Sequence, residues 1–400
     1  MNKKVLIFSL AYPPFVGGAE LAIKEETDRI KDIEFDMVTL RFDSNLPKFE
    51  RIGNVNVHRI GFTKPGAKME DLVKYPLKLN KLIFPFIACH KASKLHKKNK
   101  YNAIWAMMAA YAGFAAMFFK SKHPKVPYLL TLQEGDPIDY ILKKVKFVKP
   151  LFKRIFTKAD YLQAISNYLA NWGKDMGFKG ELKLVPNAVN TAHFSQNYSD
   201  EELDELKKEL DKSRDDKYVI TTSRLVLKNA VDDVIKSLQF LPDNVKFLIL
   251  GDGPDREDLE KLTKELMVEN RVKFLGLVDH NIMPKYLKAS DIFIRPSLSE
   301  GFGNSFIEAM AAEIPVIATQ EGGIADFLFD SEKNPDKKPT GWAVDTRDPE
   351  GIARAIKRIL DDSEQTKRTI DTAKKMVFEK YDWNIIAKDM ESIFKKITQK

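Results

Sequence analysis

The chain has 400 residues, of which 44% are hydrophobic and 30% are charged. A chain of this length exceeds the usual size of one hydrophobic core, so we expect a soluble protein of two domains. Cys89 is the only cysteine, which excludes an intrachain disulfide and fits a reducing compartment.

Two apolar stretches resemble membrane-targeting segments. The first ten residues contain a short apolar core that leads into a Gly-rich loop instead of a cleavage site, which favours a buried strand over a secretory signal. Residues 104–119 are too few, and too rich in glycine and alanine, for a membrane span, so we interpret them as a buried strand and helix. We therefore predict a cytoplasmic protein.

Short runs rich in β-branched and aromatic residues alternate with helical patterns along the chain. The candidate strands lie at 5–9, 35–40, 55–59, 103–106, 128–132 and 161–165, and then at 218–222, 246–250, 272–275, 292–295 and 316–319. This alternation predicts an α/β fold in which helices cover both faces of parallel sheets. The two series predict two doubly wound, Rossmann-like domains at 1–195 and 196–379, followed by an amphipathic helix at about 380–400.

The net charge of +8 is unevenly distributed. Residues 1–190 hold 32 of the 65 basic residues but only 17 of the 57 acidic ones, so this half carries +15 and the remainder −7. The segments 73–100 and 141–158 interleave lysines with large apolar residues. Such segments bind anionic membrane surfaces, although surface helices with apolar faces on the core give the same pattern. We expect peripheral membrane contact and no nucleic-acid binding, because no recognition motif accompanies the charge.

The strongest local motif follows the predicted strand at 292–295. A loop with Gly301 and Gly303 leads into a helix that begins near Asn304, and glycines at such positions allow a ligand to approach the backbone. The backbone N–H groups of the first helical turn would then form an anion site suited to a diphosphate. They belong to Asn304, Ser305 and Phe306.

Two acids flank this loop. Glu308 lies about one turn inside the predicted helix, where a carboxylate accepts hydrogen bonds from a ribose diol in other nucleotide folds. Glu300 precedes the helix and is placed to reach a transferred group. The alternative is a capped helix that happens to carry surface acids. Two acids eight residues apart around such a loop favour the functional interpretation over this alternative.

These residues carry a family resemblance. The chain resembles the retaining GT-B glycosyltransferases of family 4, in the glycosyltransferase group 1 superfamily, through its Glu-x7-Glu element at Glu300 and Glu308. Further matching elements are Tyr12-Pro-Pro-Phe-Val-Gly-Gly-Ala-Glu, Pro186-Asn-Ala-Val-Asn with Phe194, Ser223-Arg-Leu-Val, Gly251-Asp-Gly-Pro, and Pro315-Val-Ile-Ala-Thr with Gly322-Gly323.

The resemblance implies two facing Rossmann-like domains with the donor in the cleft between them, and a last helix that returns to the first domain. It also implies that Glu300 contacts the donor sugar, that Glu308 binds ribose, and that neither a metal nor a cofactor is needed. No cluster of residues at metal-ligand spacing is visible in the sequence. The implied donor-binding residues are Gly17, Gly18, Arg224, Lys228, Asn229, Gly251, Gly301, Phe302, Gly303, Asn304, Ser305 and Glu308.

Transfer from a nucleotide sugar needs cations, because the leaving nucleoside diphosphate gains negative charge in the transition state. Arg224 matches the family arginine, but Asn229 stands where the family usually has lysine, and Lys228 lies one position early. We predict catalytic roles for Glu300, Arg224 and Lys228. The alternatives are a surface salt bridge for Arg224 and an ordinary loop position for Lys228.

The amino-terminal domain offers weaker candidates. Gly17 and Gly18 precede a helix and would let a loop close over the donor, although a tight turn also requires glycine. Gln133 stands where the family often has histidine, and it cannot titrate near pH 7, which excludes it as a general base. Gln133, Glu134 and Asp136 are therefore acceptor candidates by position, with a solvated loop as the alternative for the acids.

The sequence thus predicts an enzyme that moves a sugar from a UDP- or GDP-sugar to a glycan or lipid-linked acceptor, with retention of configuration. Two rivals remain. A sugar-nucleotide epimerase of the same fold binds the same donor. A catalytically weak, membrane-associated scaffold fits the replacement of the family's usual residues at Ala188, Asn229 and Ala230.

Overall fold

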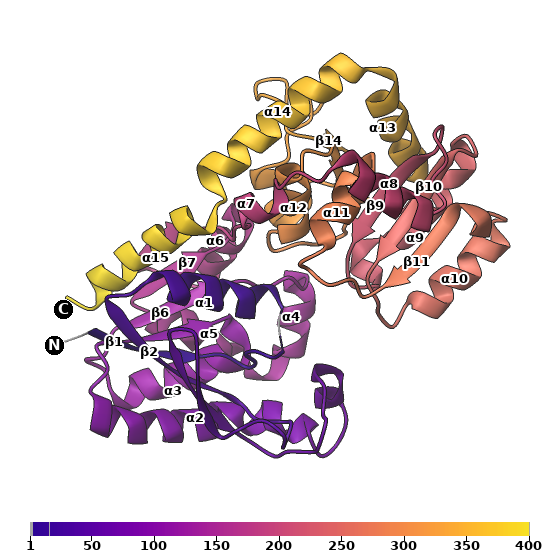
Figure 1. Ribbon diagram of the computed structural model, residues 1–400. Coiled ribbons are helices and arrows are strands. Elements are labelled where there is room, and N and C mark those ends of the chain that lie inside the picture. Colours follow the sequence, from indigo (N-terminus) through magenta and orange to yellow (C-terminus); the bar gives the residue numbers. More distant parts are fainter. Residues whose placement is uncertain (1–2, 16, 400) are drawn as a thin grey trace. The chain divides into compact units, whose positions relative to one another are not determined.

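The computed structural model describes residues 3–15 and 17–399, and the chain divides into two compact units (Figure 1). Unit 1 comprises Met1–Asn187 and Trp383–Lys400, and unit 2 comprises Ala188–Asp382. The boundaries differ from the predicted residues 195 and 379. The reason is local: the backbone N–H of Val189 donates to the Tyr381 carbonyl at 2.9 Å, so the entry to unit 2 pairs with its exit.

Unit 1 contains an eight-stranded sheet in the order β3-β4-β2-β1-β5-β6-β7-β8. All neighbours are parallel except β3 and β4. The sequence did not predict β3 and β8, which are short edge strands with exposed positions. The strands are β1 (Lys3–Phe8), β2 (Ile33–Leu40), β3 (Phe49–Ile52), β4 (Val55–Ile60), β5 (Ala103–Met107), β6 (Tyr128–Leu132), β7 (Tyr161–Ala164) and β8 (Glu181–Leu184).

Helices cover both faces of this sheet. Helices α2 and α3 pack side by side on one face, and α1 packs with α15 on the other (Figure 1). The last helix belongs to unit 1 because its apolar stripe is buried there, with the Phe394 ring 5.5 Å from Phe35 and 5.1 Å from Trp105. The helices are α1 (Gly18–Arg29), α2 (Lys78–Asn99), α3 (Phe114–Lys122), α4 (Ile138–Lys144), α5 (Lys149–Lys158), α6 (Asn167–Asp175) and α15 (Trp383–Ile397).

The apolar run at 104–119 forms β5, a π-helical turn η2 (Ala109–Gly113) and most of α3, as predicted. Most of its side chains are buried in unit 1. Within residues 3–15 and 17–399, no helix combines the length and the apolarity that crossing a bilayer demands.

Unit 2 contains a six-stranded, fully parallel sheet in the order β11-β10-β9-β12-β13-β14. The strand order reverses between β9 and β12, which makes their carboxyl ends the topological switch point of a doubly wound sheet. The sequence did not predict the two-residue strand β14. The strands are β9 (Lys217–Thr222), β10 (Val245–Leu250), β11 (Val272–Gly276), β12 (Ile292–Arg295), β13 (Val316–Ala318) and β14 (Trp342–Ala343).

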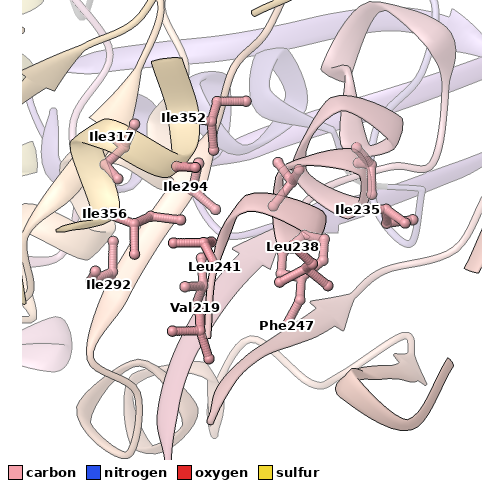
Figure 2. Close-up of a cluster of buried hydrophobic side chains, with 14 of the residues drawn as sticks. Val219, Ile235, Leu238, Leu241, Phe247, Ile292, Ile294, Ile317, Ile352 and Ile356 are labelled. Atoms are coloured by element: carbon pink, nitrogen blue, oxygen red, sulfur yellow. The ribbon is translucent and has the colours of Figure 1, made fainter. Parts of the chain in front are cut away.

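An aliphatic core holds helices to this sheet. Ile352 and Ile356 of α13 lie against Ile292 and Ile294 of β12 (Figure 2). Burial of such side chains stabilises the fold by roughly 1.5–3 kcal/mol each. The helices of unit 2 are α7 (Thr191–Phe194), α8 (Asp200–Glu209), α9 (Val231–Ser237), α10 (Arg256–Glu265), α11 (Met283–Lys288), α12 (Asn304–Ala311), α13 (Pro349–Asp361) and α14 (Ser363–Lys380).

Candidate active site

Two loops of unit 2 meet at the switch point. Residues 223–230, the cation loop, follow β9, and residues 296–303, the acid loop, follow the neighbouring strand β12. The backbone N–H of Leu298 donates to the carbonyl oxygen of Lys228 at 2.7 Å and ties the loops together. Ligands of doubly wound sheets bind outside the carboxyl ends of the strands at this position. The predicted cations and acids therefore lie on adjoining loops at a ligand-binding edge.

A third loop, after β10, fits against the cation loop backbone to backbone. Gly251 has φ +144°, and a Cβ there would lie 1.8 Å from the carbonyl oxygen of Ser223. A Cβ on Gly253 would lie 2.2 Å from the carbonyl oxygen of Leu225. Only glycine permits this approach. Gly251, predicted as a donor-site residue, thus shapes the loop that carries Arg224.

Glu300 is held in place inside the acid loop. Its side chain is buried, and Oε1 accepts hydrogen bonds from Nη2 of Arg295 at 2.9 Å and from Oγ of Ser297 at 3.4 Å. Its carbonyl oxygen accepts from the N–H of Gly323 at 2.9 Å. Gly322 has φ +63°, and a Cβ there would lie 2.1 Å from the same carbonyl oxygen. The sequence assigned no role to Arg295, although a cation at the end of a buried strand signals an acidic partner nearby.

Helix α12 begins at Asn304, as predicted, after Gly303 with φ +96°. One detail of the predicted anion site is wrong: the N–H of Phe306 donates to the Gly303 carbonyl at 3.2 Å and is not offered to a ligand. The Phe302 side chain is also unavailable, because it is buried against the rings of Phe327 and Tyr381. Only the backbone of Phe302 is left to contact a donor.

Glu308 lies on α12, where its side chain is 12% exposed and its Oε1 is 3.0 Å from Nε2 of His280. The ring of His280 packs edge-on against Phe194 at 5.1 Å, and its carbonyl oxygen lies 3.2 Å from Nε2 of His193. The sequence did not reveal this pairing, because 28 residues separate the two partners. A carboxylate fixed by one oxygen is suited to bind a ligand diol with the other.

The cation loop presents its charges at residues 224 and 228. Arg224 is exposed, and Lys228 is half-buried within the short helix Leu227–Asn229. Asn229, at the family's lysine position, is buried, and its Nδ2 donates to the carbonyl oxygen of Arg224 at 2.6 Å. Asn229 therefore braces the backbone that carries Arg224, and its buried amide supplies no charge.

Ala230, at a family glycine position, adopts a glycine-like conformation. Its backbone has φ +51° and ψ +40°, the left-handed region that costs a residue with a Cβ roughly 1–2 kcal/mol. Ala188, the other such change, is not among the residues with positive φ. The backbone of the cation loop thus keeps a conformation that glycine favours, despite the alanine.

We predict that Ala230→Gly is more stable than Ala188→Gly by roughly 1–2 kcal/mol in free energy of unfolding. Both alanines are buried, so each variant loses one buried methyl group and gains the same chain entropy. The difference between their free energies of unfolding therefore measures the backbone strain that Ala230→Gly removes at residue 230. Urea unfolding of the two variants measures it, and equal stabilities would contradict the strain assigned to Ala230.

Several polar atoms around these loops are buried without a partner in the protein. Buried polar groups are nearly always hydrogen-bonded, so such a concentration points to a ligand or solvent site. The atoms are Oγ1 of Thr221, Oγ of Ser223, Oδ1 of Asn229, Nε of Arg295 and Oγ of Ser305.

Unit 1 places two of the three acceptor candidates under the carboxyl edge of its own sheet. Gln133 is buried, and its Nε2 donates to Oδ1 of Asn187 at 3.0 Å. Glu134 is also buried, and it accepts from the backbone N–H groups of Ala109 at 2.6 Å and Gln133 at 2.9 Å. Burial raises the pKa of Glu134 to about 7. Glu134 is therefore a buried carboxyl group that binds two backbone N–H groups, and it is not a solvated acid. Asp136, in contrast, is exposed.

Gly17 and Gly18 lie at the start of α1, and both are exposed. Gly17 has φ −123°, which any residue adopts, and a Cβ there would approach only the end of the Glu20 side chain, at 2.9 Å from Oε2. A Cβ on Gly18 would meet nothing within 4 Å. The tight-turn alternative for these glycines therefore has no support from the backbone. Among the residues that the structure describes, no group of three or more His, Cys, Asp or Glu side chains is arranged to hold a metal ion.

Comparisons with known proteins agree with this geometry. Residues 202–376 match the family model of the group 1 glycosyl transferases. An uncharacterized glycosyltransferase of Methanocaldococcus jannaschii is 26% identical over 410 aligned residues, which cover 98% of each chain.

Solved structures show the same fold. Sucrose-phosphate synthase from Thermosynechococcus elongatus superposes with a TM-score of 0.80 over 99% of both chains, at 20% identity. The Anabaena HepE protein in complex with UDP-glucose superposes with a TM-score of 0.77, at 19% identity, over 98% of this chain and 99% of its own. The predicted α/β fold with two Rossmann-like domains is thereby confirmed. With residues 202–376 matching the model of the group 1 glycosyl transferases, the chain is a glycosyltransferase of the GT-B fold.

Proposed function

We propose that the enzyme transfers a hexosyl group from a UDP- or GDP-sugar to a glycan or lipid-linked acceptor, with retention of configuration and without a metal or cofactor. The observation that carries this proposal is the pair Glu300 and Glu308, which flanks the start of α12 at the switch point of unit 2. A cation-bearing loop adjoins it through the Leu298 to Lys228 hydrogen bond. The acid loop and α12 thus carry, in chain order, a carboxylate for the sugar, backbone N–H groups for the diphosphate and a carboxylate for the ribose.

Each group has a distinct task. The backbone N–H groups of Asn304 and Ser305 bind the diphosphate at the positive end of α12. Arg224 and Lys228 neutralise the charge that develops on the leaving diphosphate, which stabilises the transition state more than the ground state. Glu308 binds the ribose diol, and Glu300 orients the sugar.

The epimerase alternative is not favoured. Epimerisation requires titratable groups around the sugar, whereas the set of sequence motifs in this chain favours transfer. The glycosyltransferase family model over residues 202–376 also supports transfer. The HepE complex with UDP-glucose, which has the same fold, supports a uridine nucleotide as the first donor to test.

A thermal-shift screen with UDP, GDP, ADP and their sugars tests the donor site. A ligand at one hundred times its Kd stabilises the native state by about 2.7 kcal/mol, so one nucleotide should raise Tm clearly. We predict that Glu308→Ala abolishes this shift, because the ribose loses its acceptor.

The matched control is Glu313→Gln, just beyond the end of α12. Glu313 forms ion pairs with Lys288 and Lys374, so its replacement lowers the starting Tm without touching the ribose site. A nucleotide shift that survives in Glu308→Ala would sink the ribose assignment. Vesicle binding by a wild-type chain that responds to no nucleotide would support the scaffold alternative.

We also propose that unit 1 docks on an anionic membrane on the cytoplasmic side, where a lipid-linked acceptor is presented. Helix α4 and the segment that links it to α5 carry the apolar part of this surface: Phe147 is 95% exposed, and Tyr140 and Val148 are about half exposed. Four lysines around them are exposed as well, namely Lys143, Lys144, Lys146 and Lys149.

Helix α2 of the same unit carries further exposed apolar side chains. Burial lowers the pKa of Lys81 on α2, and the charge of Lys144 on α4 lowers it further. On α2, Leu82 and Phe86 are exposed. Part of the alternative also holds, because α2 and α5 turn apolar side chains to the core: α2 buries Phe84, Ala88 and Cys89, and α5 buries Phe152, Ile155 and Phe156.

Phe147→Ser is expected to weaken binding to vesicles that contain phosphatidylglycerol by about tenfold. The reason is that the variant can no longer bury one large apolar side chain in the membrane. Co-sedimentation measures this, and Leu277→Ser in unit 2, where the side chain is 83% exposed, is the control. Equal binding of Phe147→Ser and wild type would overturn the docking surface.

A further inference from the structure

The last residue of β12 is a buried arginine in an apolar strand. Arg295 is 8% exposed, and its neighbours Ile292, Phe293 and Ile294 are fully buried. Charged side chains are rarely buried without a partner, because their desolvation costs several kcal/mol. The partner here is Glu300, whose Oε1 lies 2.9 Å from Nη2.

The guanidinium lies among the acid loop, the first turn of α12 and the end of β9. It is 4.4 Å from the centre of the Phe306 ring, and Nη1 is 3.5 Å from the carbonyl oxygen of Thr222 at the end of β9. A Cβ on Gly303 would lie 3.2 Å from Nη2. Arginine suits this place because its rigid, planar fork stacks on a ring and donates in fixed directions, whereas lysine offers a mobile point charge.

We propose that Arg295 is the positioning residue of the donor-sugar subsite. It holds the Glu300 carboxylate through Oε1, together with the hydroxyl of Ser297, and so presents the other oxygen to the hydroxyl groups of the hexosyl moiety. The inference rests on the proposed function, in which Glu300 contacts the sugar. Because Arg295 acts through Glu300, it controls recognition of the sugar and leaves recognition of the nucleotide unchanged.

Arg295→Lys tests this assignment by titration calorimetry with UDP against UDP-glucose, and with GDP against GDP-mannose. The variant is expected to bind the nucleoside diphosphate within about twofold of wild type and to lose about tenfold in affinity for the nucleotide sugar, the worth of one charged hydrogen bond. Ser297→Ala, which removes the other donor to Oε1, should lose about threefold in the same direction, and it serves as the test if Arg295→Lys does not fold.

Arg271→Lys is the matched control for loss of a structural arginine. Arg271 lies in the same unit and donates to the carbonyl oxygens of Leu238, Pro242 and Val245, away from the acid loop. The Arg271→Lys variant should have a lower Tm than wild type but the same ratio of affinities for the nucleotide sugar and the nucleoside diphosphate. Equal affinities of Arg295→Lys and wild type for the nucleotide sugar would overturn the inference alone. If no nucleotide binds the wild type, the proposed function fails and the inference fails with it.

Discussion

Replacing Arg224 with alanine is expected to lower kcat about 10²- to 10³-fold, the usual effect of removing one preorganised donor to a developing negative charge. The reason is geometric. Arg224 is exposed on the cation loop, whose backbone is braced by the Asn229 amide and joined to the acid loop at Leu298. The braced backbone fixes the position from which the Arg224 side chain reaches the proposed diphosphate site.

Stability should hardly change, because surface substitutions usually stay within about 0.5 kcal/mol. Arg214→Ala, an exposed arginine of the same unit outside the loop, is the control and should retain full activity. Release of nucleoside diphosphate from the nucleotide sugar measures the rate. An Arg224→Ala enzyme that keeps kcat within a factor of two would remove the leaving-group role from this residue.

Gly251→Ala is expected to destabilise the protein by about 3 kcal/mol, through a strained backbone and a clash with the Ser223 carbonyl. The added Cβ would lie 1.8 Å from that oxygen at a φ of +144°. The cation loop must move away to relieve the contact, so the fraction that folds should also turn over slowly. Urea unfolding and donor turnover measure the two effects.

Gly276→Ala separates strain from clash. Gly276 has φ +71°, but the nearest atom to an added Cβ is 3.6 Å away, on the Arg256 side chain. This variant should cost only the strain, roughly 1–2 kcal/mol, and keep its turnover. Equal losses in both variants would show that the contact with Ser223 contributes nothing.

The buried parts of the fold were predictable because their signal is local. The strands at the centre of unit 2 each contain a short apolar run, and β12 was predicted with its observed bounds. Edge strands β3 and β8 were missed, since half-exposed residues carry no such run. The start of α12 was predicted because two glycines before a helical pattern leave few other conformations.

The candidate site was predicted less completely, because its details depend on partners that are distant in the sequence. His280 pairs with Glu308 across 28 residues, and Glu134 accepts from Ala109 across 25. Arg295 and Glu300 are only five residues apart, yet their pairing depends on the path of the acid loop. The sequence showed that Asn229 departs from the family's usual lysine, but it did not reveal that the Asn229 side chain supports the Arg224 backbone.

The central claim is that the carboxyl edge of unit 2 binds the nucleotide sugar through α12 and its two flanking loops. A crystal structure of the enzyme with UDP or GDP tests it most directly. Diphosphate oxygens are expected about 3 Å from the backbone N–H of Ser305, and a ribose diol at the same distance from the Glu308 carboxylate. A nucleotide that binds elsewhere, with Glu308 still paired to His280 alone, would contradict it.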